Sequence, residues 1–187
     1  MAACLFATCF AQDYKKNPAF GISYVLFDFK SANDIRTSGL ATVIKNRQLG
    51  RIRSMGTGFG VNYYEGLSDH IDFAGSLAGS FLKYPVPNKP EDATDEFLLD
   101  ANATANLKLT TDRYWVSPFI TAGLGASKYK GYYGAYIPLG VGIQVNLWDK
   151  TYFFFNSQYR VALTETASYH LYHGFGIATN LYKKKAK

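Results

Sequence analysis

Hydrophobic and polar side chains alternate along eight stretches of this chain, each about ten to fourteen residues long. In the clearest stretch, 97–109, every odd position is phenylalanine, leucine or alanine, and most even positions are polar. The stretch 135–148 alternates nearly as regularly. Since successive side chains of a β-strand point to opposite faces, each stretch predicts a two-faced strand. The predicted strands are 19–29, 56–67, 71–84, 97–109, 115–127, 135–148, 151–163 and 169–182.

The links between these strands alternate in length. Short turns are predicted near Ser68–Asp69, at 110–113 and at 149–150, and longer or more polar links at 30–55, 85–96, 128–134 and 164–168. Alternating short and long links are typical of an up-and-down barrel with turns at one rim and loops at the other. An even number of strands places both chain ends at the short-turn rim, which is periplasmic in an outer-membrane barrel.

The longest link, 30–55, does not alternate. Its aliphatic residues recur instead at rough helical spacing, as Ile35, Leu40, Val43 and Ile44 do. This spacing predicts a first external loop that contains one short helix over 37–48.

The two faces of the predicted strands differ in a way that favours a membrane. One face carries Leu, Ile, Val, Phe and Ala, which suits lipid, and the other carries mainly Gly, Ser, Asn, Thr and Ala. Small uncharged side chains fit the interior of a narrow barrel, whereas a soluble barrel or β-sandwich would show many charges to water. Charged residues are only 18% of the chain, below the roughly 25% that is usual in soluble domains.

No segment has the ~18–20 uncharged apolar residues that a membrane-spanning helix needs, so any crossing must use a closed sheet. We therefore predict an all-β fold, an eight-stranded antiparallel up-and-down transmembrane β-barrel. Tyrosine and tryptophan near strand ends are expected to form girdles at the two membrane interfaces. They are Tyr24, Tyr63, Tyr84, Tyr114, Trp115, Tyr129, Trp148, Tyr152, Tyr169 and Tyr182.

The first eleven residues predict a partial signal peptide. Residues 1–11 are short, apolar and uncharged, include both cysteines, Cys4 and Cys9, and precede a polar segment. Cleavage after Ala11 is expected, which leaves a barrel domain at 12–187 with a short basic tail. The formal net charge is +6, but four lysines lie in the last five residues. With no basic stripe in the body of the chain, no nucleic-acid partner is expected.

Several motifs carry a family resemblance. They are QDYKKNP at 12–18, NPAFGISYVLFDFKSA at 17–32, VNYYEGLSDHIDFAGSLAGSF at 61–81 and GFGIATNLY at 174–182. Together they resemble the OmpA-type outer-membrane β-barrel family of Gram-negative bacteria, in the short, barrel-only form of Bacteroidetes-like species. The resemblance implies location in the outer membrane, contact with its lipids and lipopolysaccharide, and a barrel that is monomeric.

The last strand resembles the signal that the outer-membrane assembly machinery reads. The residues that the resemblance assigns to this signal are Gly174, Gly176, Ile177, Leu181 and Tyr182. A role for Tyr182 in the aromatic girdle alone is the alternative.

Four charged residues are expected to point into the barrel. By alternation they are Asp72 and Lys108 near the periplasmic end, and Asp100 and Arg160 near the outer end. We expect them to pair within these groups, because an uncompensated buried charge is costly. They could form a gate across a narrow pore or a structural polar plug. The plug is favoured, because eight strands leave little room for a channel.

The sequence gives little sign of catalysis, and neither a cofactor nor a metal is expected. His170 and His173 lie three residues apart in a predicted strand, so they face opposite sides and cannot share a metal ion. Ser168 and His170 share a face with Glu165 nearby, but the His-x-Ser order of lipid A deacylases is reversed here. A structural role for these residues is favoured, and the chain is not expected to be an enzyme.

We therefore predict a structural outer-membrane barrel whose external loops contact the surroundings or lipopolysaccharide. The candidate contacts in the first loop are Arg36, Lys45, Arg47, Arg51 and Arg53, whose cations would meet lipopolysaccharide phosphates. A merely solvated basic face is the other interpretation of these residues. A narrow porin-like pore and a soluble lipocalin-like lipid-binding barrel remain alternative functions.

Overall fold

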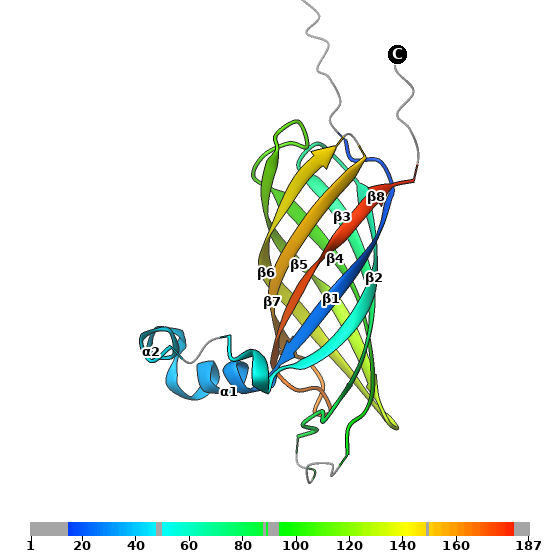
Figure 1. The fold of residues 1–187 in the computed structure, drawn as a ribbon. Helices are drawn as coiled ribbons and strands as arrows, with labels where there is room; N and C mark the ends of the chain where they lie inside the picture. Colours follow the sequence, from blue (N-terminus) through cyan, green and yellow to red (C-terminus); the bar gives the residue numbers. More distant parts are fainter. Residues whose placement is uncertain (1–14, 48–49, 88, 90–93, 149, 182–187) are drawn as a thin grey trace, which may run out of the picture.

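The chain forms a closed barrel of eight antiparallel strands (Figure 1). A computed structural model describes residues 15–47, 50–87, 89, 94–148 and 150–181. The strands are β1 (Ala19–Asp28), β2 (Gly56–Gly66), β3 (Ile71–Leu82), β4 (Glu96–Lys108), β5 (Val116–Tyr129), β6 (Tyr132–Trp148), β7 (Thr151–Ala162) and β8 (His170–Asn180). Each pairs with the next, and β8 closes the barrel on β1. The predicted fold class and all eight strands are confirmed.

The two faces of the wall are those that alternation predicted. Along β4, side chains at even positions from 98 to 108 are buried inside the barrel and those at odd positions from 97 to 107 are exposed outside. The outer wall is aliphatic and aromatic: Leu77, at the centre of β3, is 45% exposed, and Phe59 of β2 is 74% exposed. Leu77 pairs with Val61 of β2 and Ala101 of β4. Because directly paired side chains point to the same face, this register places the outward-facing residues of the three strands on one surface.

The links divide the barrel into two rims. We call "terminal rim" the end with the β2–β3, β4–β5 and β6–β7 links, where Ala19 and Asn180 are paired. The "loop rim" at the other end has the β1–β2, β3–β4, β5–β6 and β7–β8 links. The expected longer link at 128–134 is wrong, because β5 and β6 continue to a two-residue turn, Lys130–Gly131, with Tyr129 paired to Tyr132. Lys130 adopts the left-handed conformation this tight turn requires, with φ 52°.

The first loop contains two α-helices, not the single helix predicted over 37–48. Helix α1 (Phe29–Ser38) follows β1 directly, because the Asp28 carboxylate caps it by accepting a hydrogen bond from Ser31 N at 2.8 Å. It ends at Gly39, whose φ of 80° breaks the helical path, and α2 (Leu40–Lys45) follows. A 3₁₀ turn, Ile52–Ser54, leads into β2.

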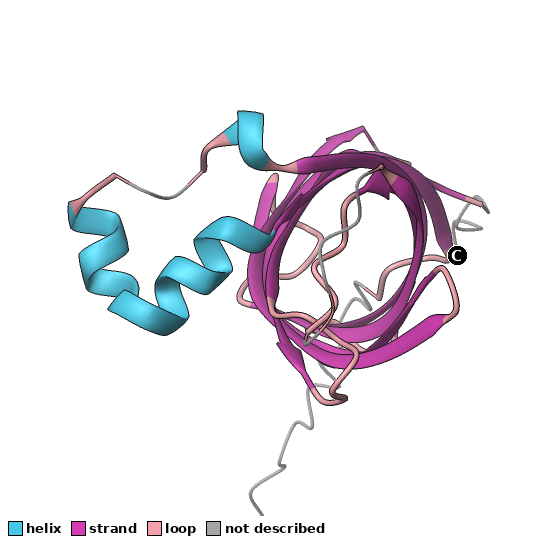
Figure 2. Cartoon of the chain, turned by 90° about the horizontal axis from the view of Figure 1, so that it is seen from below, coloured by secondary structure: helices cyan, strands magenta, loops and turns pink. Residues whose placement is uncertain are grey.

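The helices α1 and α2 form an arm at the loop rim. Figures 1 and 2, which view the barrel from the side and from below, both show this arm extending sideways from the wall. Among the helices that the structure describes, none is long and apolar enough to span a membrane.

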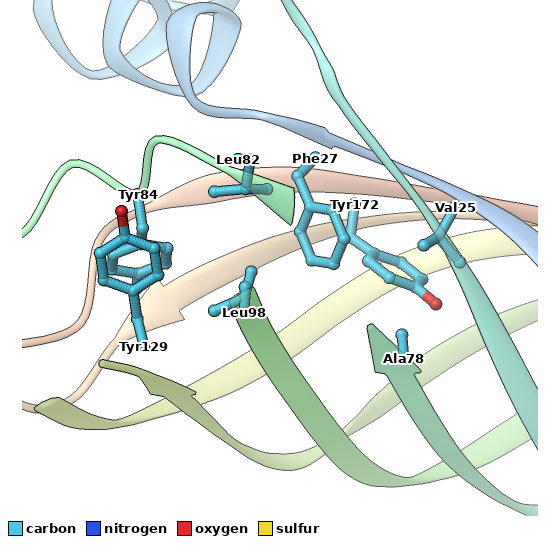
Figure 3. Packing of buried hydrophobic residues seen from close by; sticks show 8 residues of the cluster. All are labelled: Val25, Phe27, Ala78, Leu82, Tyr84, Leu98, Tyr129 and Tyr172. Carbon is cyan, nitrogen blue, oxygen red and sulfur yellow. The ribbon is translucent and has the colours of Figure 1, made fainter. Parts of the chain in front are cut away.

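Aromatic side chains fill much of the lumen near the loop rim. In Figure 3 the rings of Tyr84 and Tyr129 overlap in the view, and Phe27 lies next to Tyr172. The ring centroids are 5.4 Å apart in the first pair and 5.5 Å apart in the second. The full cluster is Val25, Phe27, Ala78, Leu82, Tyr84, Leu98, Tyr129 and Tyr172.

Three tyrosines expected in the membrane girdles lie inside instead. Tyr84, Tyr129 and Tyr152 are 4%, 2% and 4% exposed. The girdle prediction is wrong for them. Tyr129 and Tyr152 occupy positions of β5 and β7 whose side chains point inward, and alternation keeps them inside even near a strand end. Tyr114 and Trp115, by contrast, are exposed next to the terminal rim.

Glycines on the inner face make space for large aromatic rings in the lumen. A Cβ at Gly125 would lie 2.3 Å from the Tyr136 ring, and one at Gly142 would lie 2.2 Å from the Phe119 ring. The small residues that the sequence shows on the inner face therefore accommodate large neighbours rather than leave an open lumen.

Candidate functional site

The four inward charges lie inside the barrel at two levels. Asp72 and Lys108 lie near the terminal rim, and Asp100 and Arg160 nearer the loop rim, as alternation indicated. Their exposed fractions are 1%, 2%, 1% and 0% in that order. Buried charges must be paired or carry a large desolvation cost, so the partners of each decide what the lumen can do.

The charges near the terminal rim form a balanced group. Lys108 Nζ lies 3.0 Å from Asp72 Oδ1 and 3.0 Å from Asp112 Oδ1. Lys16 Nζ contacts Asp72 Oδ2 and Gln144 Oε1 from the other side, and lies 4.0 Å from Asp112 Oδ2. We call these five residues the terminal-rim cluster. Its two lysines and two aspartates compensate one another, which makes the burial tolerable.

Lys16 was missed in the sequence because it precedes the first strand, where alternation gives no direction. Gly66 N donates a hydrogen bond to Lys16 O at 3.1 Å, which holds this segment against the end of β2. The ammonium also lies 4.8 Å from the ring centroid of Tyr152. Burial lowers the pKa of Lys16, and the carboxylates of Asp112 and Asp72 oppose that shift.

The charges nearer the loop rim form a group around Arg160. Arg160 Nη1 lies 2.8 Å from Asp100 Oδ2, and Tyr136 OH donates to the same oxygen at 2.8 Å. The guanidinium carbon lies 3.8 Å from the ring centroid of Tyr172 and 4.6 Å from that of Tyr136. The aromatic faces thus stabilise the cation where water is excluded. We call Asp100, Tyr136, Arg160, His170 and Tyr172 the arginine cluster.

Hydrogen bonds fix His170 as a neutral imidazole. Its Nδ1 lies 2.8 Å from Ser168 O, an acceptor only, so Nδ1 carries the proton. Its Nε2 is then the acceptor facing Arg160 Nη1 at 3.3 Å. His173 lies on the opposite face, 2.9 Å from Ser157 Oγ, as the spacing predicted. Within the part of the chain that the structure describes, no cluster of histidine and acidic residues could hold a metal.

Ser168 is not arranged as a nucleophile. Its Oγ donates to Pro85 O and its backbone N donates to Tyr84 OH at 2.8 Å, while His170 contacts only its carbonyl. A nucleophilic serine requires a hydrogen bond from its hydroxyl to a base. The interpretation of Ser168 and His170 as structural residues therefore agrees with their contacts.

The residues of the predicted assembly signal occupy both faces of the last strand. Gly174 and Gly176 lie on the inner face of β8, and a Cβ at Gly176 would lie 2.8 Å from the Phe154 ring. Leu181 is 53% exposed and Ile177 is partly exposed on the outer face. Tyr182 and the predicted signal peptide at 1–11 lie outside the described residues. The role of this strand as an assembly signal stays a prediction.

The five candidate contact residues of the first loop are all exposed but do not form one site. Arg36 lies on α1, Lys45 ends α2, and Arg51 and Arg53 lie by the 3₁₀ turn. Among the five, and counting only rings in the described part of the chain, Arg36 has an aromatic partner, with its guanidinium carbon 4.5 Å from the Tyr169 ring centroid. The sequence pattern did not distinguish Arg36 from Arg47 and the others, because Tyr169 is remote in the chain.

Solved structures place this architecture among known barrels. No family model and no curated protein matches the chain. The N-terminal β-barrel domain of Pseudomonas aeruginosa OprF is 12% identical with a TM-score of 0.56, and the match covers 88% of this chain and 98% of that one. Neisserial surface protein A is 14% identical with a TM-score of 0.51, over 88% and 96%.

Ail of Yersinia pestis, the attachment invasion locus protein, is a third similar structure. It is 11% identical with a TM-score of 0.50, over 90% of this chain and 98% of that one. All three neighbours are eight-stranded outer-membrane barrels. At these identities the similarity shows the fold alone, so the narrower Bacteroidetes-like form stays a prediction.

The arginine cluster predicts strong energetic coupling between Arg160 and Asp100. Arg160→Met or Asp100→Asn alone should destabilise the barrel by about 3–5 kcal/mol, because each leaves a buried partner uncompensated. The double variant should be much less destabilised than the sum of the two. The measurement is urea unfolding of the folded barrel in detergent micelles.

A matched control is the exposed pair Lys130–Glu96, whose charged atoms lie 3.5 Å apart and whose side chains are 38% and 41% exposed. Lys130→Met should change stability by only about 0–1 kcal/mol, because water screens this pair. Additive effects of the Arg160 and Asp100 substitutions would show that the buried pair is not coupled.

Proposed function

We propose that this chain is a structural outer-membrane barrel with a lumen closed to solutes and external loops that contact the cell surface, including lipopolysaccharide. The loop rim faces outside and both chain ends lie on the periplasmic side. The observation that carries the proposal is the inversion of polarity: charges are buried inside the wall and large hydrophobic side chains are exposed outside it.

The outer wall supports the membrane location. The exposed fractions of Ile22, Phe59, Leu77, Leu124 and Val141 are 63%, 74%, 45%, 65% and 61%. A soluble monomer rarely exposes an apolar patch above about 300–600 Å², whereas lipid accommodates a continuous apolar wall. The strands have 10–17 residues, enough for the ~9–11 that a tilted membrane strand needs.

The buried charges support a closed lumen rather than a pore. Arg160 and Asp100 are 0% and 1% exposed, and Lys108 and Asp72 are 2% and 1% exposed. In a water-filled channel such groups would be hydrated, as they are in wide barrels. The arginine cluster and the terminal-rim cluster thus favour the polar plug over the gate.

If the lumen is closed, the protein contacts its surroundings through the loop rim. The β1–β2 link carries Arg36, Lys45, Arg47, Arg51 and Arg53, all exposed. Exposed cations at the outer surface suit the phosphates of lipopolysaccharide by charge complementarity. No catalytic role is proposed.

Membrane fractionation tests the location. The mature chain should be recovered in the outer membrane and migrate faster on a gel unboiled than boiled, because a closed barrel resists detergent until heated. A chain that is soluble and migrates identically either way would favour the lipocalin-like alternative, with the outward faces forming a core.

Planar bilayers test the closed lumen. The folded wild-type barrel should give no steady conductance, because two levels of paired charges and aromatic rings fill its interior. A steady single-channel conductance from wild-type protein would reject the plug and favour the narrow pore, without affecting the outer-membrane location.

The lipid-facing wall gives a further prediction. Leu77→Arg, at the strand centre, should destabilise the barrel in phospholipid vesicles by about 2–4 kcal/mol, because the charge would sit at the bilayer midplane. Leu109→Arg is the matched control: Leu109 is 64% exposed just past the end of β4, and its cost should be about 0–1 kcal/mol. The measurement is urea unfolding in vesicles. Equal effects at the two positions would contradict a wall that spans the bilayer.

A further inference from the structure

A pocket of about 470 Å³ lies at the loop rim. Its wall combines α1 with the segments that follow β3 and precede β8, which are far apart in the sequence. We call it the rim pocket and define it by its three cations and three aromatic rings. They are Lys30, Arg36, Lys83, Phe29, Tyr84 and Tyr169.

The segments around the rim pocket are fixed to one another. Ser168 N donates to Tyr84 OH at 2.8 Å, and Ser168 Oγ donates to Pro85 O, which ties the β3–β4 link to the β7–β8 link. The Phe29 ring packs edge-on against Tyr84 at 5.2 Å, which attaches the start of α1. Tyr84 itself is only 4% exposed. A site held together in this way loses little entropy when a ligand binds.

The rim pocket is basic and carries no acidic side chain in its lining. Lys30, Arg36 and Lys83 are all exposed, and none forms an ion pair with a carboxylate of the described residues. Lys30, Asn33 and Arg36 follow one another at intervals of three, so they share one face of α1. Three cations that form no ion pair with a described carboxylate favour an anionic ligand.

Arg36 lies over an aromatic ring. Its guanidinium carbon lies 4.5 Å from the centroid of the Tyr169 ring. A guanidinium stacked on an aromatic face keeps its in-plane N–H groups available for two parallel hydrogen bonds to a phosphate or sulfate. This contact distinguishes Arg36 from the other cations of the first loop.

We propose that the rim pocket binds a phosphate or sulfate group carried by a sugar. The three cations match the anionic group, Asn33 and Ser54 in the lining provide hydrogen bonds for hydroxyls, and the half-buried ring of Phe29 provides apolar surface for the sugar. The volume lies within the roughly 300–1,000 Å³ of small-molecule sites. The proposal rests on the proposed function for access, since ligands from outside the cell or from lipopolysaccharide reach this rim only if it faces outward.

Titration calorimetry on the full folded chain in detergent micelles tests the pocket, with glucose 1-phosphate as the probe and glucose as the neutral control. Wild type should bind glucose 1-phosphate and not glucose. Arg36→Ala and Lys83→Ala should each weaken binding about tenfold or more, since each removes a charge-assisted hydrogen bond. Heat-modifiable migration checks that each variant is folded.

Lys89→Ala and Lys128→Ala are the matched controls, because both remove an exposed cation near the loop rim, neither lines the pocket, and neither is among the candidate contacts of the first loop. They should leave the affinity within about twofold of wild type, since surface charges this far from the ligand are screened by salt. Equal losses in all four variants would show diffuse charge attraction rather than a site. Absence of binding to wild type would also overturn the proposal. Membrane fractionation and conductance test the proposed function independently of this result.

Reconstituted vesicles distinguish the two sources of the anion. If lipopolysaccharide phosphates occupy the pocket, glucose 1-phosphate should bind more weakly to the barrel in vesicles that contain lipopolysaccharide than in phospholipid vesicles. Equal affinity in the two vesicles would assign the pocket to a soluble phosphorylated or sulfated sugar.

Discussion

The pairing of β1 with β8 is the constraint on which the rest of this structure depends. It joins Ala19 to Asn180 at one end and Asp28 to Leu171 at the other, so the sheet has no free edge. Closure satisfies the backbone hydrogen bonds of every strand within the wall, which is what allows a sheet to stand in lipid. It also forces every second side chain into a narrow enclosed space. A charge that the sequence places there cannot reach water and must find its partner among the other inward residues.

Inside the lumen, buried charges are paired with opposite charges, and large side chains lie next to small ones. Each buried cation is compensated: Arg160 by Asp100, and Lys108 and Lys16 by Asp72 and Asp112. Glycines stand opposite the large rings, as Gly125 does beside Tyr136. Charge pairing alone would leave voids, and aromatic packing alone would leave the charges unsolvated. The two together explain why charged side chains can be nearly inaccessible to water in an eight-stranded barrel.

Alternation was sufficient to predict the strands, their faces and the inward direction of Asp72, Asp100, Lys108 and Arg160, because a strand's side chains have a fixed period of two. Where the chain is not a strand, that rule gives no information. Lys16 enters the terminal-rim cluster from the segment before β1, and Asp112 from a turn, so neither could be found. The helix that begins at Phe29 depends on a local cap by Asp28, which the aliphatic spacing did not show. The stacking of Arg36 on Tyr169 joins residues that only barrel closure brings together.

The proposed closed lumen also bears on where recognition can occur. If the interior is filled and the wall faces lipid, the aqueous surface of the molecule is confined to its two rims. The terminal rim has short links, and one of them carries Asp112, which is already engaged with Lys108. The loop rim has exposed cations, among which Lys30, Arg36 and Lys83 line one pocket beside aromatic rings. Specific binding of an anion is favoured where cations without ion-pair partners lie on segments that are tied together, as they do around the rim pocket. On the proposed function, the barrel is a rigid support and the links of the loop rim carry the contacts with the surroundings.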